Sequence, residues 1–128
     1  FDLPITTLPF NYYDNTTLCS HLRESEYQKV VFFSSYSIEQ IPTIGKAFFT
    51  SLLELPIPEM DFVHLEPVSW QLRNTPKDTA AHYNEDLVEV IEHLEQDNVA
   101  TIHQMEANHY GHRHEFAASL IAWSKGTP

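Results

Sequence analysis

Cysteine, glycine and long apolar runs are scarce in this chain of 128 residues. Cys19 is the only cysteine, which excludes an internal disulfide and a thiolate-rich metal site and is typical of a reducing compartment. Only three glycines are present, and they form no glycine-rich loop of the kind that cradles nucleotide phosphates. No apolar run approaches the roughly 20 residues that a membrane helix needs. We therefore expect a cytoplasmic protein that does not enter a membrane.

Positive charge is also scarce. Seven Lys and Arg residues stand against 18 Asp and Glu residues, which gives a formal net charge of -11. The basic residues are scattered along the chain, so they form no stripe that could neutralise a row of phosphates. We expect no direct binding to nucleic acid or to an anionic membrane surface. A strongly acidic surface instead favours a basic protein partner, and the sequence leaves a homo-oligomer open.

The apolar and aromatic fractions, 42% and 12%, indicate a globular chain, and its length favours one domain over residues 1–128. Residues 29–34 form a continuous apolar run that is typical of a buried strand, and residues 60–65 predict a second strand. Between them, apolar residues recur at three and four positions over 38–55, which predicts an amphipathic helix. Together these segments predict an α/β fold with a parallel βαβ unit.

Two further regions flank this unit. Residues 1–14 contain Pro4 and Pro9 and predict an extended N-terminal arm. Residues 78–123 are rich in acids and histidines, and we expect them to form a C-terminal pair of helices that covers the sheet. The chain begins at Phe1 instead of methionine and shows no signal peptide, so we expect that a preceding segment was removed.

The first helix of the C-terminal pair is acidic on one side. Seven acidic residues and no lysine or arginine lie between 78 and 97, away from the apolar face formed by Leu87, Val90, Ile91 and Leu94. Aromatic residues of irregular segments are either core anchors or hot spots for a partner. The main hypothesis is therefore a small acidic interaction or accessory subunit that binds a basic partner, without cofactor or catalytic activity of its own. The candidate partner-binding residues are Glu85, Glu89, Glu92, Glu95, Phe10, Tyr12 and Trp70.

Histidines and carboxylates also suggest an alternative. On the first helix, His82, Asp86, Glu89 and His93 share a stripe that could bind zinc, although a solvated helix face is the favoured explanation of the same residues. On the second, Glu106 and His109 have the Glu-x-x-His spacing of bundle di-iron sites, which need two such pairs. The alternative hypothesis is a metal-binding protein or metal-dependent enzyme that holds a divalent metal such as zinc or iron. Its candidate ligands are Glu106, His109, His103 and His112.

Hydroxyl groups mark the end of the first predicted strand, in the segment 34–37 (Ser-Ser-Tyr-Ser). Ligands bind at this edge of open α/β sheets. A small-molecule site here would appear as a pocket bordered by these hydroxyls. Helix capping by Ser37 explains the same residues without a ligand.

Overall fold

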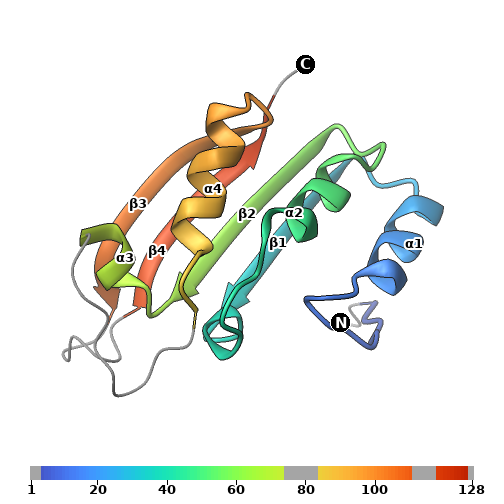
Figure 1. The fold of residues 1–128 in the computed structure, drawn as a ribbon. Coiled ribbons are helices and arrows are strands. Elements are labelled where there is room, and N and C mark those ends of the chain that lie inside the picture. Colours follow the sequence, from blue (N-terminus) through green and yellow to red (C-terminus); the bar gives the residue numbers. More distant parts are fainter. Residues whose placement is uncertain (1–3, 74–83, 111–117, 127–128) are drawn as a thin grey trace.

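A mixed four-stranded sheet with helices on it forms the body of this small α/β domain (Figure 1). The computed structural model describes residues 4–73, 84–110 and 118–126, with the side chains of 108–110 left out. None of the helices within these ranges is long and apolar enough to span a membrane. In chain order, the elements are α1 (Thr16–Glu24), β1 (Lys29–Ser35), the 3₁₀ helix η1 (Ile38–Gln40), α2 (Lys46–Leu53), β2 (Glu59–Glu66), α3 (Ser69–Arg73), α4 (Leu87–Gln96), β3 (Ala100–Tyr110) and β4 (Ala118–Lys125).

The strand order is β1-β2-β4-β3. β1 and β2 are parallel, with α2 between them in the chain, whereas β4 is antiparallel to both of its neighbours. Phe32, Phe62 and Trp123 are aligned in register across β1, β2 and β4. Their rings are stacked, with centroids 4.7 Å and 3.9 Å apart, and the Phe49 ring of α2 meets Trp123 edge-on at 5.2 Å. This aromatic row forms the centre of the core.

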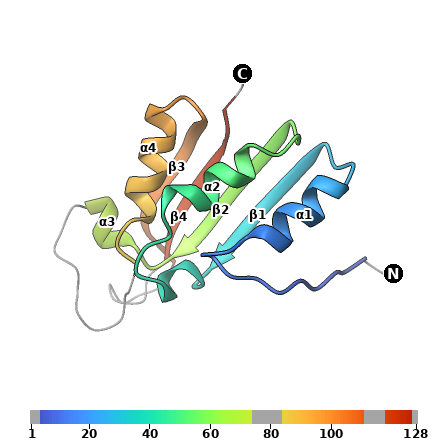
Figure 2. The same cartoon turned by 45° about the vertical axis from the view of Figure 1, so that its right-hand side comes forward.

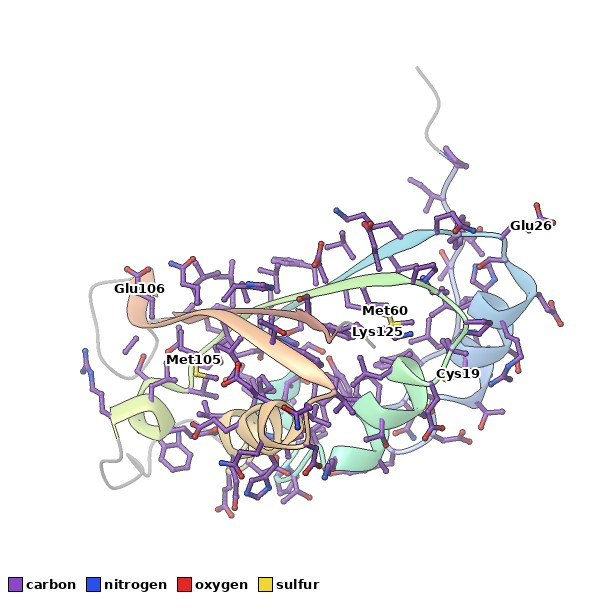
Figure 3. The ribbon with its side chains drawn as sticks, turned by 90° about the horizontal axis from the view of Figure 1, so that it is seen from above. Cys19, Glu26, Met60, Met105, Glu106 and Lys125 are labelled. Carbon is purple, nitrogen blue, oxygen red and sulfur yellow. The ribbon has the colours of Figure 1, made fainter. Side chains whose placement is uncertain are left out.

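The two faces of the sheet differ. Helices α2 and α4 lie against one face, and no helix of the described part of the chain lies on the other (Figures 2 and 3). On β1, Val31 and Phe33 point to the uncovered face and are 58% and 63% exposed. Figure 3 shows the same division on β3, where Met105 points toward the helices and Glu106 points away from them. The core therefore lies entirely on the helical side.

The helix predicted over 38–55 is wrong in extent, because η1 and α2 are separate helices with a loop between them. Ile41 is extended, with φ −119° and ψ 140°, since Pro42 disfavours a helical conformation in the residue before it. Gly45 precedes α2 with φ 74°, in the region that favours glycine. Only the last part of the predicted segment therefore forms an α-helix.

The predicted C-terminal helix pair is also wrong. The first helix is present as α4, but the second is replaced by the antiparallel strands β3 and β4. A register shift after Ile102 leaves Ile102 and Met105 both packed on the core, although they are three residues apart. That spacing imitates a helical repeat, which explains the error.

Candidate functional site

A groove between α3 and α4 brings together four of the predicted partner-binding residues. Its volume is about 260 Å³. Its lining comprises Trp70, Gln71, Glu85, Val88, Glu89, Glu92, His93 and Gln96. The lining positions on α4 (88, 89, 92, 93 and 96) include pairs three and four residues apart, so they share one face of the helix. Figure 1 shows α3 beside the N-terminal end of α4.

Two polar side chains hold the first turn of α4 against α3. Asn84 is fully buried, and its Oδ1 accepts hydrogen bonds from the N–H groups of Leu87 (2.9 Å) and Asp86 (3.2 Å). Gln71 Oε1 accepts from the N–H of Val88 at 3.0 Å, while its Nε2 donates to the carbonyl of Asn84 at 2.9 Å. These bonds satisfy N–H groups that have no partner within the helix. They also fix the spacing of α3 and α4.

The groove is negatively charged above an apolar base. Glu85, Glu89 and Glu92 are exposed, whereas Val88 is buried. No lysine or arginine is among the described lining residues. The buried face of α4 consists of Leu87, Val88, Val90, Ile91 and Leu94, which confirms that the apolar side of this helix faces the core and its glutamates face water.

Trp70 forms the α3 wall of the groove and is partly buried. Its Nε1–H is buried and has no hydrogen-bond partner among the described residues. An unsatisfied buried N–H costs about 1–3 kcal/mol.

Glu95 lies away from the groove, although it was grouped with the other glutamates. Its Oε2 accepts a hydrogen bond from the N–H of Ile102 at 2.7 Å, so it joins α4 to the start of β3. Glu95 is not among the lining residues of the groove. Its role in partner binding stays a prediction.

The stripe of His82, Asp86, Glu89 and His93 is divided. His82 lies outside the described residues. The Asp86 carboxylate accepts hydrogen bonds from the N–H groups of Ile44 (2.8 Å) and Gly45 (3.0 Å), which holds the loop before α2. Glu89 and His93 line the groove. Asp86 therefore has a structural role, apart from the groove.

Phe10 and Tyr12 pack on their own chain and are not among the lining residues of the groove. The Tyr12 ring meets Phe10 at 4.8 Å and Phe48 of α2 at 5.3 Å, in both cases edge-on. The Tyr12 hydroxyl is 2.7 Å from Ser37 Oγ. Because Ser37 makes this contact, its side chain does not cap η1 as predicted. Phe10 remains 48% exposed, and its role in partner binding stays a prediction.

The candidate metal ligands fall on β3 or beyond it, so the helical spacing assumed for them is wrong. His103 Nε2 is 2.7 Å from Ser124 Oγ, and Glu106 accepts a hydrogen bond from Gln104 Nε2 at 2.9 Å. The side chain of His109 and the whole of His112 lie outside what the structure describes. Within the described residues, no group of three or more His, Cys, Asp or Glu side chains could hold a metal ion. The metal site stays a prediction.

A buried polar chain, which the sequence did not reveal, connects Trp123, His64 and Ser34. Trp123 Nε1 donates to His64 Nε2 at 2.9 Å, and His64 Nδ1 is 2.7 Å from Ser34 Oγ. Burial lowers the pKa of His64 to about 3, so the ring is neutral. Since the indole can only donate, the single ring proton is on Nδ1 and is donated to Ser34. His64 therefore cannot take a proton from Ser34, as a base beside a nucleophile would.

The chain continues to Glu66, which is fully buried at the end of β2. Its carboxyl accepts from the Ser34 hydroxyl and from the N–H groups of Ser37 (3.3 Å) and Glu39 (3.2 Å). Burial raises the pKa of Glu66, while these three hydrogen bonds lower it. The arrangement holds η1 against the sheet.

One signal for this network was present in the sequence. The core-facing positions of β2 alternate with outer ones, and Met60 and Phe62 define the core-facing set. The same period places His64 and Glu66 inside, where polar groups require partners. The partners themselves come from distant segments and gave no signal.

No protein-family model, curated protein or solved structure matches this chain.

Proposed function

We propose that this protein is an interaction subunit that binds a basic segment of a partner protein in the groove between α3 and α4. The observation that carries the proposal is the convergence of Trp70, Glu89 and Glu92 on one groove. Binding is its function in this proposal, with no catalytic step. The buried free thiol of Cys19 supports a cytoplasmic location.

The chemistry of the groove fits an arginine or lysine side chain. Such side chains have an apolar stem and a charged end. The stem would pack on Val88 and the Trp70 ring, where a cation also interacts favourably with the aromatic face. The charged end would meet Glu89 and Glu92. The net charge of -11 would add long-range attraction that speeds association with a basic partner.

A synthetic peptide with four arginine-glycine repeats and blocked ends tests this proposal. Trp70 is one of only two tryptophans, and the other, Trp123, is 1% exposed, so binding should change the fluorescence of Trp70. We expect saturable binding that weakens as salt rises, because the attraction between exposed charges is screened. The same peptide with glutamine in place of arginine should not bind.

Charge reversal locates the binding surface. The double variant Glu89→Lys/Glu92→Lys should weaken peptide binding roughly tenfold, since it replaces attraction by repulsion. The matched control Glu24→Lys/Glu26→Lys changes the net charge equally at exposed acids on and beside α1 and should cost less than about twofold. An equal loss of peptide affinity in both variants would show that binding depends only on the net charge, and it would contradict a binding site in the groove.

A further inference from the structure

A second cavity, with different chemistry, lies between the N-terminal segment, β1 and α2. Its volume is about 310 Å³. Its walls are mainly aromatic and include the rings of Phe10, Tyr12, Phe32, Phe48, Phe49 and Phe62. Figure 2 shows α1 and α2 on either side of the end of the N-terminal segment, next to β1. The cavity shares no lining residue with the acidic groove.

The polar side chains that border this cavity are the imidazole of His64, whose two ring nitrogens are both engaged, and three hydroxyls with spare hydrogen-bonding capacity. Tyr12 and Ser37 are 2.7 Å apart, so one of their two hydroxyl hydrogens joins them and the other is left to donate. Ser34 accepts from His64 and donates to Glu66, which leaves one lone pair on its oxygen. The cavity therefore offers one donor and one weak acceptor. Burial raises the pKa of Tyr12, against a lowering effect of Ser37, so its hydroxyl keeps its proton at neutral pH.

The charges around the cavity disfavour an ionised ligand. No lysine or arginine is among its described lining residues, so nothing there would neutralise an anion. A cation would lose its hydration shell in this cavity without gaining a partner, because the nearby Glu66 carboxyl already accepts three hydrogen bonds from the chain.

We propose that this cavity binds an uncharged, planar aromatic molecule of about two fused rings that has one hydrogen-bond acceptor. The rings would pack against the aromatic walls, and the acceptor would take the spare hydrogen of the Tyr12–Ser37 pair. The volume sets the size of the ligand. A dry cavity of about 150 Å³ holds one benzene ring, so about twice that volume accommodates two fused rings.

A matched series of naphthalenes tests the chemical class. The four probes are 2-acetylnaphthalene, naphthalene, 2-naphthoate and 2-naphthylmethylammonium, which are respectively a neutral acceptor, a hydrocarbon, an anion and a cation. Titrations of ¹⁵N-labelled protein by NMR should show saturable shifts at the amides of residues 34–38 with the ketone. The hydrocarbon should bind about five- to tenfold more weakly, which is the effect of one neutral hydrogen bond. The two ions should bind more weakly still.

The double variant Tyr12→Phe/Ser37→Ala removes the donor while it keeps the Tyr12 ring. It should reduce the affinity for the ketone about five- to tenfold and leave that for naphthalene unchanged. The control Tyr13→Phe/Ser35→Ala removes two exposed hydroxyls nearby and should change neither. Thermal unfolding of each variant shows that the fold is retained.

Three results would overturn the proposal. The first is the absence of saturable shifts at residues 34–38 with any neutral probe. The second is an ion that binds as tightly as the ketone, which would replace the neutral class by a charged one. The third is an unchanged preference for the ketone in Tyr12→Phe/Ser37→Ala. Because Glu89→Lys/Glu92→Lys leaves this cavity intact, ketone binding by that variant separates this proposal from the interaction function.

Discussion

The groove and the aromatic cavity differ in where their polar groups reside. In the groove, the charges are exposed on one helix, while the buried groups below serve to fix α4 against α3. In the cavity, the surface is apolar, and the polar groups form a chain from Ser34 through His64 to Trp123 that is shut inside the protein. Exposed charges can change with little effect on folding, whereas a buried chain couples any change to stability. The first region is thus suited to a variable partner and the second to one fixed arrangement.

The largest expected difference between the two regions is in how the stability of the protein depends on acid pH. The pKa of His64 is about 3 in the folded protein and 6.5 in the unfolded chain. Between these two pH values the unfolded chain binds a proton that the folded protein does not, so the stability decreases as the pH is lowered. This contribution amounts to about 2 kcal/mol between pH 6.5 and 4.5. In urea unfolding, the stability difference between wild type and His64→Gln should shrink by about this amount over that range. Glu66, whose pKa is raised, acts in the opposite sense in both proteins.

The matched control for this test is His93→Gln, which alters an exposed histidine of the groove. Its stability should follow that of wild type at every pH. A constant difference between wild type and His64→Gln would show that His64 is protonated in the folded state.

Substitution of the two tryptophans should give a difference of intermediate size in the free energy of unfolding. Trp123→Phe removes the donor to His64 Nε2 and leaves a buried acceptor unsatisfied, which should cost about 2 kcal/mol in urea unfolding. Trp70→Phe removes an N–H that has no partner among the described residues, so it should cost less than about 1 kcal/mol. A larger loss for Trp70 than for Trp123 would reverse the proposed roles of the two regions.

The smallest effect should appear within α4. In the arginine-peptide titration, Glu89→Lys should weaken binding about threefold, because it reverses one charge in the groove. Glu95→Lys should change it less than about 1.5-fold, since Glu95 lies off the groove and pairs with the Ile102 N–H. If both variants lose affinity by the same factor, peptide binding depends on the total charge of α4 and not on the groove.

The groove was more predictable from the sequence than the cavity. The period of Leu87, Ile91 and Leu94 predicts which side of α4 is buried, and the glutamates follow from it. The position of Trp70 opposite these glutamates could not be predicted in the same way. It depends on the Gln71 and Asn84 side chains, whose hydrogen-bond partners are set by the tertiary fold. The hydroxyl segment 34–37 predicted the edge of the cavity. The chain from Ser34 to Trp123 joins residues 89 positions apart, which no local pattern encodes.

The fold was predicted where a single local rule applied. The runs at β1 and β2 are strands, as their apolar character indicates. In the C-terminal region two rules competed, because the shifted register of β3 gave its core residues the spacing of a helix. Pairing with β4 decided the outcome, and such pairing depends on residues far along the chain.

The strand order has a consequence for how this protein is made. β4 is the last of these four strands to leave the ribosome, yet it lies between β2 and β3, so Asp61 cannot pair with Ser124 until β4 has been made. Until then one edge of β2 has unpaired peptide groups, and Phe62 lacks the Trp123 ring beside it. The four-stranded sheet therefore closes only through long-range pairing once β4 has left the ribosome, and the nascent chain is exposed to aggregation until then.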